Sequence, residues 1–135
     1  MNQLKKWRRD LHQIPELGLE EIKTTAYLMS ELTAMGYDPH PLPLLPTGCY
    51  VFIDYHKSKT VAFRSDIDAL PIQEDNEVDY CSQHKGCMHA CGHDGHMAML
   101  LGLAQYLSTT TDHMNVNILL LFQPAEESPG AAKDV

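Results

Sequence analysis

The stretch Met88-His-Ala-Cys-Gly-His-Asp-Gly-His-Met-Ala-Met-Leu-Leu-Gly102 decides how the rest of the chain is arranged. Four side chains of metal-binding type lie within six of its residues: Cys91, His93, Asp94 and His96. Thiolate and imidazole ligands suit zinc, and imidazole with carboxylates also suits manganese, nickel or cobalt. Two glycines inside the same stretch let the backbone turn tightly and approach an ion closely. The pattern therefore predicts a metal site in a tight turn.

A buried helix is expected directly after this cluster. The residues that follow are apolar at helical spacing, namely Met97, Leu100, Leu101, Ala104 and Leu107. The positive end of such a helix favours a thiolate and a carboxylate beside it. The polar cluster should therefore lie at the start of the helix.

A structural zinc knuckle is the alternative interpretation of the same segment. Its four ligands would come from the set Cys81, Cys87, His89, Cys91 and His93. The cysteine spacings are C-x5-C and C-x3-C, whereas common zinc modules use paired C-x2-C. Because the pair Cys91 and His93 leaves room for ligands from elsewhere in the chain, we favour a catalytic site.

Composition limits the classes of protein to which the chain can belong. Its 135 residues are a usual size for one domain, and a hydrophobic content of 44% is ordinary for a globular protein. The net charge of −8, from 18 acidic against 10 basic residues, argues against nucleic acid as a partner. No apolar run is long enough for a bilayer, and the basic N-terminus lacks the apolar part of a secretion signal. We expect no membrane partner, a cytoplasmic location and reduced cysteines.

Apolar periodicity predicts helices over residues 4–14 and 19–35, with Gly36 as the C-terminal cap of the second. His12, near the end of the first helix, is interpreted as a surface or capping histidine. The proline-rich segment 38–48 should be an extended connection.

Strand composition marks residues 50–55, 60–64 and 116–122, and we expect a hairpin-like loop at 56–59. The nearly continuous apolar run at 116–122 is typical of a strand that is covered on both faces. Helices and strands alternate along the chain, so the expected fold is α/β, with helices packed on a mixed sheet.

Acidic pairs follow two of the expected strands. Asp66 and Asp68 come after 60–64 and would face one side of an extended chain, so that one could bind or orient a ligand while the other holds a histidine or water. Glu126 and Glu127 come after 116–122, and one can bind metal while the other acts as general base. Either pair alone is best explained as a solvated strand end. Together with the Cys/His cluster they favour a metal site beyond the carboxyl ends of the strands.

Four segments, 8–18, 64–71, 88–96 and 122–127, resemble the motifs of the M20 metallopeptidase family. The resemblance is to its amidohydrolase branch, which includes hippurate hydrolases, auxin-conjugate hydrolases and N-acetyldiaminopimelate deacetylases. The segments 82–84 and 128–131 look most like those of the deacetylases.

The resemblance implies a centre of two divalent metal ions, which are zinc, manganese, nickel or cobalt. Cys91 and His93 match two of the family's ligands, Glu127 matches its carboxylate ligand, and Glu126 matches its general base.

The resemblance assigns the remaining polar residues less sharply. Asp66 and Asp68 match the segment that holds the family's catalytic aspartate, without deciding between them. Asp94 and His96 are expected to support the ligands without binding the metal.

The resemblance further implies that residues 1–135 are the N-terminal part of a zinc-exopeptidase-like catalytic domain. The implied reaction is metal-dependent hydrolysis of N-acyl amino acids, foremost deacetylation of N-acetyl-L,L-diaminopimelate in lysine biosynthesis. The alternatives are a broader aminoacylase or hippurate-type hydrolase, or a non-catalytic metal-binding fragment. The family's other histidine ligands and its inserted dimerisation domain are expected beyond Val135. We therefore expect this chain to be inactive alone and the full-length parent to form a homodimer.

Overall fold

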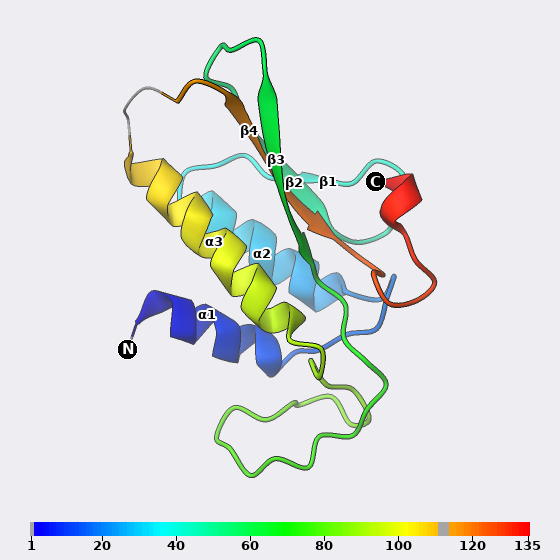
Figure 1. The fold of residues 1–135 in the computed structure, drawn as a ribbon. Coiled ribbons are helices and arrows are strands. Elements are labelled where there is room, and N and C mark those ends of the chain that lie inside the picture. Colours follow the sequence, from blue (N-terminus) through cyan, green and yellow to red (C-terminus); the bar gives the residue numbers. More distant parts are fainter. Residues whose placement is uncertain (1, 111–113) are drawn as a thin grey trace.

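One mixed sheet and three α-helices on one of its faces make up the architecture of the computed structural model, which describes residues 2–110 and 114–135 (Figure 1). The elements follow one another as α1 (Gln3–His12), α2 (Ile22–Ala34), β1 (His40–Pro41), β2 (Cys49–Ile53), β3 (Thr60–Asp66), α3 (His93–Thr109), β4 (Asn117–Gln123) and the short 3-10 helix η1 (Ala132–Asp134). This arrangement confirms the expected α/β class with a mixed sheet.

The strand order is β1-β2-β4-β3, so β4 lies between β2 and β3, although it follows both in the chain. It pairs antiparallel with β2 and parallel with β3. The expected hairpin-like loop at 56–59 is therefore wrong, because β2 and β3 are not neighbours. Residues 56–59 instead carry the chain past the position that β4 later fills, and the Asn117 side chain holds this segment by accepting hydrogen bonds from the backbone amides of Tyr55 and Lys57.

Helix α3 crosses over from β3 to β4, which is the connection that parallel strands require. The register pairs Asp66 at the end of β3 with Gln123 at the end of β4. Both strands therefore finish at the same edge of the sheet, and α3 begins near that edge (Figure 1). This brings together the three segments in which the sequence predicts metal-binding chemistry.

The core lies between the helices and one face of the sheet. Helix α3 packs against β3 and β4, α2 packs against β2, and α1 packs on α3. Ile118, Leu120 and Phe122 of β4 point into this core and are buried. Leu119 and Leu121 point to the other face and are half-buried. The expectation that this strand is covered on both faces is thus wrong for the described residues, whose α-helices cover one.

The second helix begins three residues later than the sequence predicts. Leu19 adopts a left-handed backbone conformation with φ of 67°, which ends the preceding turn and prevents a helix from starting there. Glu21 takes the N-cap position, and its side chain is buried. At the other end, Gly36 follows the last turn with φ of 92°, as expected for a glycine cap. No helix among the described residues is long and apolar enough to cross a membrane.

Candidate metal centre

The turn before α3 places a thiol and an imidazole side by side. Gly92 has φ of 89°, a conformation that a side chain would strain, and its carbonyl accepts the backbone N–H groups of Gly95 and His96. Cys91 lies just outside the helix and is exposed, whereas His93 is the first helical residue and is only 2% exposed. The helix thus begins inside the polar cluster. Cys91 lies in the tight turn that Gly92 permits, and His93 lies in the first turn of the helix.

Cys91, His93 and Glu127 form one group of potential metal ligands. One ligand atom of each lies within 4.8 Å of the others, although Glu127 comes from the turn after β4. Donors that share an ion at zinc-like bond lengths lie at most about 4.6 Å apart, so small side-chain adjustments suffice. The hydrogen bond between the Cys91 thiol and the Glu127 carboxylate raises the pKa of Cys91 above its ordinary value.

Asp66, His93 and His96 form a second group, which the sequence did not predict as a ligand set. The Nδ1 atom of His96 donates to Oδ1 of Asp66 at 2.7 Å, and the His93 and His96 rings stack with centroids 5.6 Å apart. The sequence pattern includes His96 among the side chains of metal-binding type, whereas the family resemblance gives it a supporting role. The structure instead puts its ring among potential ligand atoms.

The two groups share the imidazole ring of His93, and a contact with Asp68 leaves only one of its two nitrogens free for a metal. His93 Nδ1 donates to the carbonyl oxygen of Asp68 at 2.9 Å and lies 3.2 Å from its carboxylate. Nε2 is therefore the free nitrogen, and it lies 3.7 Å from Asp66 and 3.9 Å from Glu127. This is the usual outer contact that fixes the tautomer of a metal-binding histidine.

The electrostatics of His93 and Asp68 follow from this contact. Burial alone would raise the pKa of Asp68, but hydrogen bonds from His93 and from the backbone amides of Glu127 and Glu126 lower it overall. Burial opposes the charged form of His93 as well, yet the bond to Asp68 and the charges of Asp66 and Asp68 raise its pKa. Asp68 is therefore a carboxylate that orients His93, and Asp66 faces the free nitrogen.

The acidic pair lies in the turn that follows β4. Ala125 has φ of 50°, and the backbone amide of Glu127 donates to Oδ2 of Asp68 at 2.9 Å. Glu126 is exposed and belongs to neither ligand group of the described residues. Glu126, the expected general base, is thus the direct neighbour of Glu127, and its exposed carboxylate can accept a proton.

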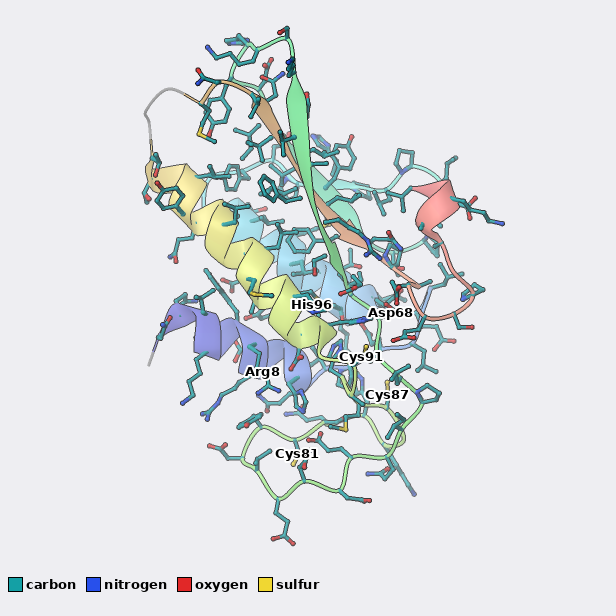
Figure 2. The ribbon with its side chains drawn as sticks, viewed as in Figure 1. Arg8, Asp68, Cys81, Cys87, Cys91 and His96 are labelled. Carbon is teal, nitrogen blue, oxygen red and sulfur yellow. The ribbon has the colours of Figure 1, made fainter. Side chains whose placement is uncertain are left out.

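The zinc-knuckle alternative is not supported by the positions of the other cysteines. Neither ligand group among the described residues includes Cys81, Cys87 or His89. Cys81 lies in the long loop before α3, where its thiol donates to the Asn76 carbonyl. Figure 2 shows Cys81 in that loop, away from Cys91, Asp68 and His96 at the edge of the sheet.

Sequence reasoning missed several residues around the site. His12, expected at the surface, is 3% exposed and lies between Asp94 and Glu74, at 2.7 Å and 3.1 Å. Arg8 donates to the same Asp94 oxygen at 2.8 Å. Glu21 is fully buried and accepts the backbone N–H of Ala125. The motif 8–18 contained Arg8 and His12, but no local pattern reveals partners more than 60 residues away.

Both ligand groups fit a divalent cation by their chemistry. Each combines imidazole with carboxylate, and the first adds a thiol, a set that suits zinc, manganese, nickel or cobalt. A cation would also offset the carboxylates of Asp66, Asp68 and Glu127, which gather around one buried histidine.

Comparisons with known proteins give a matching family and several relatives. Residues 62–135 match peptidase family M20/M25/M40. An N-acetyldiaminopimelate deacetylase from Oceanobacillus iheyensis is 46% identical over 135 residues, which cover 98% of this chain and 36% of that protein. The enzyme of the same name from Streptococcus sanguinis is 53% identical over 125 residues, which cover 90% of this chain and 32% of that protein.

Solved structures show the same relationship. A Bacillus subtilis protein described as a dinuclear metal-binding peptidase of the M20 family superposes with a TM-score of 0.88 at 38% identity, covering 96% of this chain and 37% of that one. The chain thus spans about a third of the length of these relatives. The match over more than half of its residues shows that the chain belongs to peptidase family M20/M25/M40.

Proposed function

We propose that this chain is part of a metal-dependent amidohydrolase that removes the acyl group from N-acyl amino acids. The observation that carries the proposal is the meeting of Cys91, His93 and Glu127 from two separate segments, next to an exposed Glu126. A potential ligand group with a free carboxylate beside it is the minimum that metal-assisted hydrolysis requires.

Two divalent cations are the proposed cofactor, and the description of the B. subtilis protein as dinuclear metal-binding supports their number. When bound, such cations polarise the acyl carbonyl and make a neighbouring water more acidic. Cys91, His93 and Glu127 would hold them, and Asp66 and His96 supply further donors. Asp68 would not bind a cation directly. Its role is to keep His93 in the tautomer whose Nε2 is free to bind.

Glu126 is the proposed general base. Its carboxylate would take a proton from the attacking water and later give it to the leaving amine. A cavity of about 300 Å³ opens beside Asp68 and Glu127, and most of its other lining residues are apolar: Leu17, Ala69, Leu70, Pro71 and Pro129. Such a cavity, next to the acidic pair, is suited to the less polar part of a small N-acyl amino acid.

N-acetyl-L,L-diaminopimelate is the proposed substrate, because the curated relatives at 46% and 53% identity carry the name of its deacetylase. That reaction would place the protein in lysine biosynthesis in the cytoplasm, and a homodimer is the proposed assembly. A broader aminoacylase or hippurate-type hydrolase would use the same catalytic residues and differ in the acyl group.

A chimaeric enzyme tests this function at the length of the relatives. Residues 1–135 replace the matching segment of the O. iheyensis protein, and acetate release from N-acetyldiaminopimelate is measured. Glu126→Gln keeps the shape of the side chain and removes the base, so turnover should fall roughly 100- to 10,000-fold while the metal content stays unchanged. Glu127→Gln should instead lower the metal content.

The controls separate failure of folding from failure of function. The unchanged chimaera must bind metal and melt cooperatively before its activity is interpreted. A folded, metal-loaded chimaera without acetate release contradicts the proposed activity. If Glu126→Gln lost metal and Glu127→Gln kept it, the two roles would have to be exchanged.

A further inference from the structure

Residues 8–21 include the N-terminal motif 8–18. They contribute no atom to either ligand group, yet they contact every segment that carries a potential ligand. We infer that residues 8–21, here called the brace, position the three segments that carry the metal ligands. The inference rests on the metal centre proposed above, and it assigns a role to residues that take no part in the chemistry.

The first contact of the brace holds the start of α3. Asp94, the neighbour of the ligand His93, is 1% exposed, and its Oδ2 accepts hydrogen bonds from Arg8 Nε at 2.8 Å and from His12 Nδ1 at 2.7 Å. The other ring nitrogen of His12 lies 3.1 Å from the buried carboxylate of Glu74. Bonds of this charge-assisted kind are among the strongest in proteins, so α1 fixes the first turn of α3.

The second contact holds the segment after β3. The backbone carbonyl of Glu16 accepts the N–H of Ala69 at 2.8 Å, directly after the Asp68 that orients His93. The carboxylate of Glu16 accepts the backbone amides of Lys23 and Thr24 at the start of α2. The brace is thereby anchored to a helix while it holds the Asp68 segment.

The third contact holds the turn that carries the acidic pair. Glu21 is 0% exposed, and its Oε1 accepts the N–H of Ala125 at 2.9 Å. Ala125 has φ of 50°, a conformation that a residue with a side chain adopts only when its surroundings enforce it. Gly18 packs against the same turn, and a Cβ atom at this position would lie 2.2 Å from the carbonyl oxygen of Ser128.

These contacts matter because the ligands come from segments far apart in sequence. Partners outside the ligand set orient metal-binding side chains, and their loss typically weakens metal binding roughly 10- to 100-fold. A brace that contacts all three segments would hold them in their positions relative to one another before the cation binds. The free energy of metal binding would then be reduced only slightly by the entropy cost of ordering these segments.

The experiment measures the affinity of the 135-residue chain for Co²⁺, followed by the absorption of the cobalt–thiolate bond to Cys91. Arg8→Gln removes one bond to Asp94 from a side chain that is 41% exposed, so the fold should survive. Gly18→Ala displaces the turn after β4. Each should weaken Co²⁺ binding roughly tenfold or more and reduce the thiolate absorption at limiting Co²⁺.

Matched controls share the chemistry of each change without touching the brace contacts. Lys5→Gln removes an exposed cation from α1, and Gly102→Ala adds a methyl group to α3 against the flexible end of Leu4. Both should bind Co²⁺ as the unchanged chain does. His12→Asn can still donate a bond to Asp94 and should bind more tightly than His12→Leu.

Circular dichroism and thermal melting establish that each variant is folded. If Gly18→Ala does not fold, the Co²⁺ affinity of Arg8→Gln alone tests the brace. Folded Arg8→Gln and Gly18→Ala variants with the Co²⁺ affinity of the unchanged chain overturn the brace and leave the metal centre intact. An unchanged chain that is folded but binds no Co²⁺ overturns the metal centre itself, and the brace with it.

Discussion

Cys91 and His93 both hold protons more tightly than free side chains do. The carboxylate of Glu127 raises the pKa of the Cys91 thiol, and the bond to Asp68 with the nearby carboxylates raises the pKa of His93. A metal binds the thiolate and the neutral imidazole, so both protons must leave when it binds. Acid therefore opposes binding, and the affinity for metal should rise with pH until both groups are deprotonated.

Proton release on Co²⁺ binding tests whether Cys91 is a ligand. At a pH below the pKa values of both groups, binding should release about two protons per ion, and Cys91→Ser should reduce this to about one. Calorimetry in buffers of different ionisation enthalpy gives the number. Replacement of Cys49 or Cys81 by serine should leave it unchanged. Equal proton release from the Cys91→Ser variant and the unchanged chain would show that the thiol is not a ligand.

Residue-level roles were only partly predictable from the sequence. The ligand types Cys91 and His93 stand out because they are close together in the chain. The sequence could not separate Asp66 from Asp68, because that difference depends on which of them reaches His93 Nδ1. The burial of His12 was equally hidden, since its partner Asp94 lies on another helix 82 residues away.

At the level of elements, β4 has two unequal faces. Leu120 is 0% exposed and belongs to the core between the sheet and the helices. Leu121 is half-buried on the opposite face, where it lines a groove with Leu42, Tyr50 and Val135. A continuous apolar sequence does not reveal this difference, because both kinds of position are filled by leucine.

Alanine substitutions should separate the two faces. Leu120→Ala should lower the free energy of unfolding by roughly 2–5 kcal/mol, because it leaves a cavity in a packed core. Leu121→Ala, on the half-buried face, should cost clearly less, since water can fill part of the space. Urea denaturation followed by circular dichroism measures both. Equal losses would mean that the face of Leu121 is as well covered in solution as the core.

Helices and strands followed well from periodicity, whereas their arrangement did not. The interior of every predicted helix and strand was found, with ends displaced by a few residues. Strand order depends on pairing between distant segments, so the insertion of β4 between β2 and β3 left no signal at residues 56–59. The convergence of the three ligand segments was predictable, because it follows from the general behaviour of strand ends in α/β folds.

For the molecule as a whole, the number of metal ions that it holds determines whether it is expected to catalyse hydrolysis. Both ligand groups formed by the described residues depend on His93, and Asp68 occupies its Nδ1. One Nε2 atom serves one ion at a time. The B. subtilis relative, described as dinuclear, is more than twice as long as this chain. Because both groups share this histidine, we expect the 135-residue chain to hold a single ion tightly.

Equilibrium dialysis of the 135-residue chain against Co²⁺ should accordingly give one tightly bound ion per chain. Without a second well-held ion to share the polarisation of the carbonyl and the water, acetate release from N-acetyldiaminopimelate should not exceed that of the Glu126→Gln variant. Two tight ions per chain, or turnover well above that control, would contradict this expectation. Gel filtration at the same protein concentration would then show whether a second copy of the chain supplies the missing ligands, because a shared site requires a dimer and loses its second ion on dilution.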